Sequence, residues 1–219
     1  IEDHFSKEQL ESFEICSLDK AIRNVHFTQD INESKEAIHR LKFDEHFFLQ
    51  LFLALRKKEI NEKTFDIIEF KTQKYNMILK NLSFNLTDSQ KSVLREIIED
   101  FLLEKPMNRM LQGDVGCGKT IVSILASSVV VDNDYQVAIM APTDILAKQL
   151  YKNFRDNFEK IGIESELLVG SLKTNDKKKV LKKINDGDAM IVIGTHALFQ
   201  KDVSFKNLGF VIIDEQHRF

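Results

Sequence analysis

Hydrophobic residues recur at helical spacing through the first third of the chain. From Ser34 to about Glu62 they fall every three or four positions, with charged residues between them and no glycine or proline. This pattern predicts one long amphipathic helix, preceded by shorter helical pieces of which residues 18–25 are the clearest. We expect its stripe to pack in a core or between domains; the stripe comprises Ile38, Leu41, Phe43, Phe47, Phe48, Leu51, Phe52 and Leu55.

From Leu86 onward the pattern changes to short apolar runs that alternate with amphipathic segments. A helix is predicted from Thr87, its N-cap, to about Leu103. Strands are predicted near residues 108–112, 135–141, 164–169, 189–193 and 208–213. This alternation predicts an α/β fold with a parallel sheet flanked by helices.

A glycine-rich loop lies between the first predicted strand and the next helix, and it matches G-x-x-x-x-G-K-[ST]. Glycines let the backbone curl around phosphate oxygens, Lys119 can reach the β- and γ-phosphates, and the Thr120 hydroxyl can ligate Mg²⁺. A glycine-rich turn with an incidental lysine is the alternative. The candidate nucleotide-binding residues are Gly113, Asp114, Val115, Gly116, Cys117, Gly118, Lys119 and Thr120.

Two acidic residues follow the last predicted strand. The apolar run 208–213 is typical of a parallel strand buried on both faces, and open α/β sheets bind ligands at the carboxyl ends of their strands. We assign Asp214 to Mg²⁺, through a water molecule, and Glu215 to positioning and deprotonating the attacking water. Alone, the two carboxylates could merely cap a turn. Combined with the glycine-rich loop, they predict an NTPase.

Two further segments end strands at the same predicted sheet edge: Pro142-Thr143 and Thr195-His196. Hydroxyls and amides at helix starts can hold a sugar–phosphate backbone, but they also serve as ordinary N-caps. A lysine-rich run also has two interpretations: it is either a solvated helix face or a phosphate-attracting patch. Its members are Lys177, Lys178, Lys179, Lys182 and Lys183.

Composition limits the remaining possibilities. The length of 219 residues allows one large domain or one and a half smaller ones, and the 43% of hydrophobic residues is enough to form a core. No apolar run reaches transmembrane length, no signal-peptide pattern is present, and Cys16 and Cys117 are too few for a disulfide framework, so we expect a cytoplasmic protein. The net charge of −3 means that any nucleic-acid binding must be local.

Four stretches carry a specific resemblance. Residues 106–116, 141–149, 194–200 and 214–219 resemble the superfamily 2 motifs of the RecG family of bacterial branched-DNA helicases. Residues 17–27 and 41–56 are similar, less specifically, to the helical linker between that family's wedge domain and its motor. The transcription-repair coupling factor shares Pro-Met and Gly-Asp-Val-Gly, but residues 197–199 and Gln216-His217 favour RecG.

The resemblance implies a fold and an activity. Residues 1–80 would form the helical linker region after a wedge domain, and residues 81–219 a first RecA-like P-loop ATPase domain. That domain would stop after its Asp-Glu-Gln-His box, with the sheet incomplete there. The implied activity is ATP-dependent unwinding and remodelling of branched DNA and stalled replication forks in repair and recombination. The chain by itself would then be inactive.

The resemblance also implies partners. These are branched DNA, bound without sequence specificity, and the wedge and second RecA-like domains of the same polypeptide. It implies a monomer in the bacterial cytoplasm, associated with the nucleoid and with no membrane. Fork specificity and polarity would depend on the wedge and on the second motor domain.

Further site roles come from the resemblance alone. Gln90 matches the residue that reads the adenine edge, which implies ATP. Gln216 and His217 belong to the box that couples hydrolysis to DNA, and Cys117 stands where the family has serine. That thiol, near a helix N-terminus, is either selectively reactive or a tolerated small side chain. The implied DNA contacts are Pro142, Thr143, Thr195 and His196.

Two other functions stay open at this stage. One is a non-catalytic ATP-binding module that regulates a partner, and the other is a double-stranded DNA translocase of the coupling-factor type. A second domain bearing a catalytic arginine would favour an enzyme. A fork-binding wedge would argue against the translocase.

Overall fold

The computed structural model describes residues 1–61 and 67–218, and the chain divides into two compact units, Ile1–Lys63 and Thr64–Phe219. The sequence-based boundary after residue 80 therefore differs from the division by contacts. Helix α4 (Gln73–Asn81) packs on α6 (Lys119–Asp132) of the second unit, because its buried Ile78 joins the core of that unit. None of the described helices is both long and apolar enough to cross a membrane.

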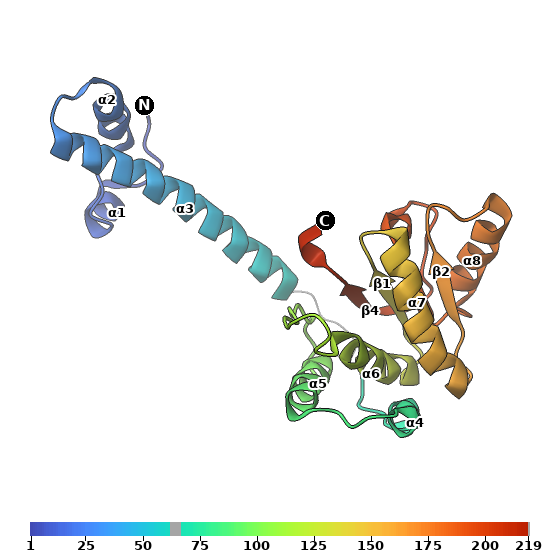
Figure 1. Cartoon of the computed structure of the whole chain (residues 1–219). Coiled ribbons are helices and arrows are strands. Elements are labelled where there is room, and N and C mark those ends of the chain that lie inside the picture. Colours follow the sequence, from blue (N-terminus) through green and yellow to red (C-terminus); the bar gives the residue numbers. More distant parts are fainter. Residues whose placement is uncertain (62–66, 219) are drawn as a thin grey trace. The chain divides into compact units, whose positions relative to one another are not determined.

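The first unit consists of three helices, with the two short ones gathered at one end of the long one (Figure 1). They are α1 (Lys7–Ser12), α2 (Leu18–Phe27) and α3 (Ile31–Asn61). Ser6 and Gln9 form a reciprocal capping box at the start of α1, and Ser17 caps α2. The predicted long helix and the predicted helix at residues 18–25 are both confirmed.

The apolar stripe of α3 is only partly packed. Near its middle, Phe43 and Phe47 stack on each other and meet Phe5 and Phe13, with ring centroids 4.9–6.3 Å apart. Farther along the helix, the side chains of the stripe are exposed, so packing of the whole stripe is not seen within this unit. These exposed residues are Phe48, Leu51, Phe52 and Leu55.

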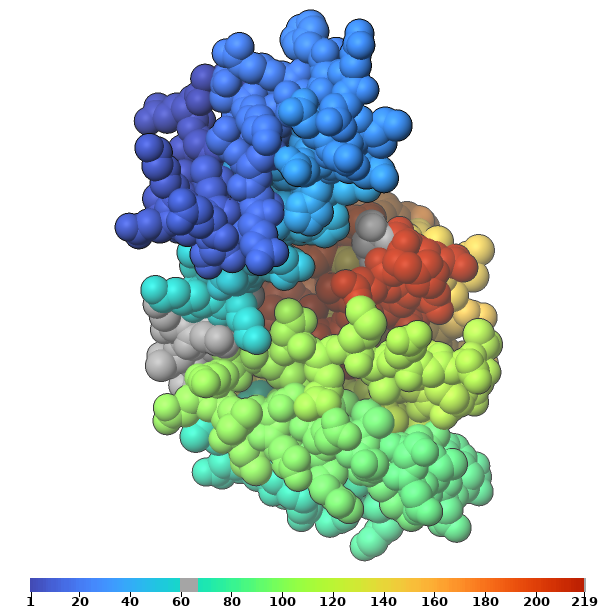
Figure 2. Space-filling model, turned by 90° about the vertical axis from the view of Figure 1, so that its left-hand side faces the viewer, coloured from blue at the N-terminus to red at the C-terminus, as the bar shows by residue number. Residues whose placement is uncertain are grey.

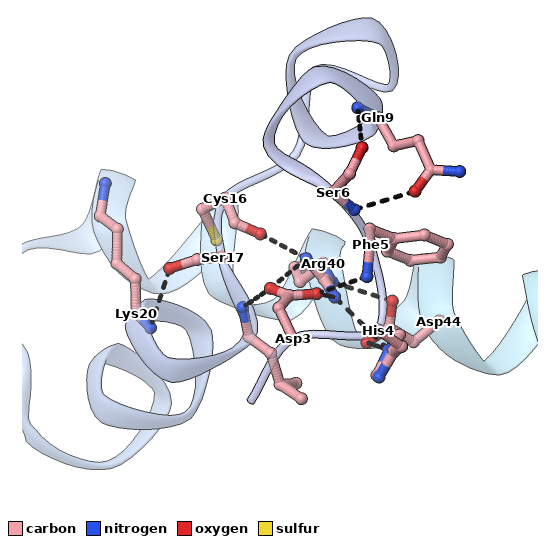
Figure 3. A network of polar contacts seen from close by, with 11 residues as sticks. Asp3, His4, Phe5, Ser6, Gln9, Cys16, Ser17, Lys20, Arg40 and Asp44 are labelled. Carbon is pink, nitrogen blue, oxygen red and sulfur yellow. Dashed lines mark hydrogen bonds and ion pairs between the residues drawn. The ribbon is translucent and has the colours of Figure 1, made fainter. Parts of the chain in front are cut away.

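A buried arginine holds the N-terminal segment of the chain against α3 (Figure 3). Arg40 is fully buried, and its guanidinium donates to the carboxylates of Asp3 and Asp44 and to the carbonyl of Cys16. Burial opposes ionisation of Asp3, but hydrogen bonds from Arg40 and from the N–H of Leu18 and Phe5 outweigh it and hold the Asp3 pKa well below its usual range. The network fixes residues that are far apart in the sequence.

The second unit is an α/β structure, as predicted. Its strands are β1 (Gln136–Met140), β2 (Ser165–Leu168), β3 (Ile191–Gly194) and β4 (Leu208–Ile213), all parallel, in the order β2-β3-β1-β4. The helices are α4, α5 (Asp88–Phe101), α6, α7 (Asp144–Phe158) and α8 (Thr174–Asp186), with the short turns η1 (Glu159–Ile161), η2 (His196–Phe199) and η3 (Gln216–Arg218).

The two faces of the sheet face different helices. Val137, Ile139, Ile191 and Ile193 point to a core shared with α4, α5, α6 and α7. The alternate residues of the strands, such as Val192, pack with α8 and η2 in a second cluster. Helix α6, which begins directly after the glycine-rich loop, is buried along most of its length. This burial fixes its position in the core.

Two predictions about strands are wrong. Residues 106–114 form no strand, because no described strand hydrogen-bonds to them, and a lone extended segment has no ladder to join. Strand β4 lies at one end of the strand order and is not buried on both faces. Phe210 and Ile212 face the core, whereas Val211 and Ile213 are exposed. The other four predicted strands are confirmed within a few residues.

Candidate functional site

The glycine-rich loop has the backbone that its glycines allow. Gly116 and Gly118 have φ of +83° and +88°, and Gly118 is the N-cap of α6. A Cβ at Gly118 would lie 2.3 Å from the Gln90 amide nitrogen, and one at Gly113 would lie 2.8 Å from the Cys117 sulfur. The loop is therefore shaped by close approaches of side chains as well as by positive φ angles.

Lys119 is folded back onto the loop that it follows. Its Nζ donates to the carbonyls of Gly113 at 2.7 Å and Asp114 at 3.0 Å, and it lies 4.0 Å from the Cys117 sulfur. The backbone N–H groups at the start of α6 have no earlier turn to bond to, so the helix N-terminus carries partial positive charge beside this ammonium. The arrangement concentrates hydrogen-bond donors for an anion at one place.

The acidic pair sits at the carboxyl edge of the sheet. Asp214 continues the ladder, since its N–H donates to the carbonyl of Met140 at 2.9 Å. Burial, and then the neighbouring charge of Glu215, raise the pKa of Asp214, while the charge of Lys119 opposes this rise. Lys119 is thus close enough to act on Asp214 electrostatically. The glycine-rich loop and the acidic pair therefore lie within electrostatic range of each other.

Figure 2 shows the C-terminal residues and the segment around the glycine-rich loop on one face of the second unit. Glu215 has φ of +51°, a left-handed conformation that is uncommon for a residue with a side chain. Its carboxylate lies 3.4 Å from His217 Nε2 and 3.9 Å from Arg218 Nε. The turn after β4 therefore keeps the Glu215 carboxylate beside two basic side chains of the same turn.

The residues at the sheet edge fit a Mg²⁺ ion that is bound together with nucleotide phosphates. Among the described residues, no group of three or more histidine, cysteine or acidic side chains could hold a metal by itself. Mg²⁺ is usually held by one or two protein oxygens and completes its shell with water and substrate phosphates. Thr120, in the first turn of α6, and Asp214 are the oxygen donors that this chain offers at the site.

Gln90 contacts the loop directly. With Thr87 it forms a capping box at the start of α5: its Oε1 accepts from the Thr87 N–H, while its backbone N–H donates to the Thr87 hydroxyl. Its Nε2 donates to the carbonyl of Cys117 at 2.9 Å. One N–H and one lone pair of the amide stay available, so an adenine edge could still be read.

The four candidate DNA contacts lie on neighbouring strand ends. The N–H of Ala141 donates to the carbonyl of Gly194 at 2.9 Å, which sets the two segments side by side. Thr143 is exposed and caps α7 by accepting from the Leu146 N–H, and His196 is exposed. Thr195 is only 8% exposed, so its side chain is not presented at the surface.

The lysine-rich run on α8 is partly engaged within the chain. Lys183 pairs with Glu164 at 2.8 Å and Glu166 at 2.6 Å, and hydrogen bonds to these two carboxylates raise its pKa above the usual range. Lys177 contacts Gln200 and Asp202. These pairs favour the solvated helix face over a phosphate-binding patch.

One set of contacts was not foreseen. Arg109, just before the loop, donates to the carboxylates of Asp100 at 2.7 Å and Glu96 at 2.5 Å on α5. Spacings of 9 and 13 residues carry no periodic signal, so the pairing could not be read from the sequence.

Comparison with known proteins places this site in a family. Residues 87–219 match the DEAD/DEAH box helicase family. ATP-dependent DNA helicase RecG of Aquifex aeolicus is 43% identical over 96% of this chain, and RecG of Streptococcus pneumoniae serotype 4 is 40% identical over all of it. The chain spans only 27% and 32% of the lengths of these relatives.

Solved structures agree with the sequence relatives. A structure of RecG bound to a three-way DNA junction matches all of this chain and 30% of that chain, with a TM-score of 0.82 and 39% identity. A hypothetical ATP-dependent RNA helicase from Sulfolobus tokodaii matches 67% of this chain and 42% of that one, with a TM-score of 0.53 and 19% identity. This second likeness supports the fold alone.

Proposed function

The chain belongs to the DEAD/DEAH box helicase family, and from that premise we propose that the protein is an ATP-dependent DNA helicase that unwinds and remodels branched DNA. The observation that carries the proposal is the position of the Lys119 ammonium and the Asp214 carboxylate, which lie within electrostatic range of each other at the carboxyl edge of one parallel sheet. A lysine beside a glycine-rich loop and a half-buried carboxylate at that edge are two of the parts that nucleotide hydrolysis requires.

The chain's own residues have separate roles in this scheme. The N–H groups of residues 113–118 and the start of α6 cradle the phosphates, and Lys119 exchanges its carbonyl partners for phosphate oxygens. Thr120 and Asp214 would hold Mg²⁺, whose charge would offset that of the nucleotide phosphates. Glu215 orients the attacking water and accepts its proton. Gln90 reads the adenine edge with its remaining N–H and lone pair, which makes ATP the nucleotide.

DNA binds at the neighbouring strand ends in this proposal. Thr143 and His196 are exposed there, on the edge that also carries the phosphate loop, and they suit contacts to a sugar–phosphate backbone that ignore sequence. The half-buried Pro142 and the buried Thr195 shape these turns. Gln216 and His217, directly after the acidic pair, transmit hydrolysis to the DNA-bound elements through the Glu215 contact.

The rest of the assignment follows the relatives. RecG, whose solved complex contains a three-way DNA junction, supports a branched DNA substrate. We extend to this protein a wedge domain, a second RecA-like domain with a catalytic arginine, a monomeric state and a place at the bacterial nucleoid in the cytoplasm. The first unit acts as the linker region, and the second unit, which includes α4, acts as the first motor domain.

A strand-displacement assay tests the proposed function. A synthetic three-way junction with one labelled strand is incubated with the protein, Mg²⁺ and ATP, and a linear duplex of the same length serves as the comparison. We expect the labelled strand to be released from the junction, faster than from the duplex and only with ATP. Hydrolysis of ATP without release of any strand would reduce the assignment to a translocase or a regulatory ATPase.

A further inference from the structure

The segment that leads into the phosphate loop is held to the second unit by its side chains. Within the described part of the chain, residues 106–112 make no backbone hydrogen bond to a strand. Met107 and Leu111 are partly buried against the core, which restrains the segment but does not fix its direction.

Two side-chain contacts tie this segment to α5. Arg109 uses Nε and Nη1 to bind Asp100 and Glu96 in the second half of the helix. At the other end, the Gln90 amide binds the Cys117 carbonyl. Since Gln90 and Asp100 are ten residues apart, the two contacts are separated by about 15 Å along the helix axis. Residues 109–117 therefore run antiparallel to α5 and are fastened to it near both ends.

Helix α5 is itself anchored well enough to serve as a brace. Its Leu94, Ile97 and Phe101 are buried in the core, and the ring of Phe101 meets that of Phe210 edge to face at 5.2 Å. Phe210 belongs to β4, four residues before Asp214. The same helix thus contacts both the segment that carries the phosphate loop and the strand that carries the acidic pair.

We propose that Arg109 is a positioning residue for nucleotide binding: together with Gln90 it clamps the phosphate loop to α5. The inference rests on the proposed function, since it concerns the same ATP site. Arg109 touches no nucleotide in this scheme. It acts by holding the loop backbone in the conformation from which Lys119 and the N–H groups bind phosphate.

The test compares Arg109→Ala with Arg155→Ala in the otherwise unchanged protein. Arg155 is also a surface arginine with two acidic neighbours, Asp156 and Glu159, but it lies on α7. Arg109→Ala is expected to raise the Kd for Mg–ATP by about three- to tenfold, as befits loss of a partly exposed two-bond network. Arg155→Ala is expected to leave it within about twofold. Equal affinity of Arg109→Ala and wild type would overturn the proposal.

Steady-state kinetics separate positioning from a general structural defect. A displaced loop weakens ground and transition states alike, so Arg109→Ala is expected to raise KM for ATP with kcat little changed. Arg109→Asp combined with Asp100→Arg restores the pair in reverse and should recover part of the lost affinity. Failure of the reversed pair to improve on Arg109→Asp alone would count against the clamp, even if the single variant binds ATP poorly.

Gln90→Glu probes the other contact, because it keeps the oxygen that accepts from Thr87 but removes the N–H that binds the Cys117 carbonyl. The clamp predicts weaker binding of Mg–tripolyphosphate, which has no adenine, as well as of ATP. Loss confined to ATP would leave Gln90 as an adenine reader only. Wild-type protein that binds neither ligand would instead refute the proposed function, so the two failures are distinguishable.

Discussion

The guanidinium of Arg40 and the carboxylate of Asp3 lie 2.8 Å apart, with Arg40 fully buried and 37 positions away in the sequence. A buried charge of this kind is tolerated only while its partners stay in place. The pair therefore makes the N-terminal residues a structural part of the helical unit and not a loose end.

Loss of Arg40 should destabilise the first unit strongly. Arg40→Met fills much of the same space but leaves Asp3 and Asp44 without a counter-charge, and the expected cost is about 3–5 kcal/mol. Arg23→Met is the matched control, because Arg23 is exposed and, among the described residues, pairs with Asp19 alone; its cost should stay below about 0.5 kcal/mol. Amide hydrogen exchange of α2 and α3 measures the loss of stability in both variants. Equal protection in the two variants would contradict the role given to Arg40.

Acid should weaken the same unit through Asp3. Its pKa in the folded chain lies below the ordinary aspartate value, so the folded state releases this proton more readily than the unfolded state. The stabilisation is complete above about pH 5 and is lost as the pH falls through the ordinary value of about 4 toward the lower folded pKa. Urea unfolding followed by NMR signals of α2 and α3 at pH 7 and pH 3 should show this loss. It should shrink in Asp3→Asn and persist in Asp19→Asn.

Lys119→Ala and Glu215→Gln should both abolish most DNA-stimulated ATP turnover, for different reasons. Removal of the ammonium weakens phosphate binding, so Lys119→Ala loses ATP affinity. Glu215→Gln keeps affinity but loses the proton acceptor, which costs about 10²- to 10⁴-fold in rate. Parallel binding and turnover measurements distinguish the two. Near-normal turnover by either variant would refute the site assignment.

Asp214→Asn should stabilise the second unit while it removes activity. Burial raises the pKa of Asp214, so ionisation at neutral pH opposes folding, and a neutral side chain of the same shape relieves this opposition. The unfolding temperature without nucleotide is expected to rise in Asp214→Asn, whereas Mg²⁺-dependent turnover falls. A lower unfolding temperature would show that the Asp214 carboxylate has a structural partner that outweighs its burial.

Alkylation should block the ATP site through Cys117. The thiol is exposed, and its sulfur lies 4.0 Å from Lys119 Nζ inside the phosphate loop. Cys16 is partly buried, and burial raises its pKa, so it should react with iodoacetamide more slowly. We expect modification at Cys117 first, with loss of ATP binding and protection by ATP. Cys117→Ser should bind ATP before and after treatment; unchanged affinity of the alkylated wild type would reject the idea.

The sequence by itself determined the local elements, and it carries the hypothesis about the chemistry of the site. The helical spacing of apolar residues predicted α3, short apolar runs predicted four strands, and Thr87 predicted the start of α5. Each of these signals depends on neighbours within a few residues of the chain. The glycine-rich loop could be recognised in the sequence for the same reason, since its glycines, lysine and threonine lie within eight consecutive residues. That Asp214 would meet this loop followed from one general rule, the placement of ligands at the carboxyl ends of parallel strands.

Tertiary structure alone decided which segments have partners. Residues 108–112 have the composition of a strand but pair with no described strand, and Val211 is exposed on the face of β4 opposite to Phe210. The same holds for the clamp of Arg109 on α5 and for the pair of Arg40 with Asp3. A hydrogen bond or ion pair needs two groups within about 3 Å, and when these are many residues apart only the folded backbone brings them together.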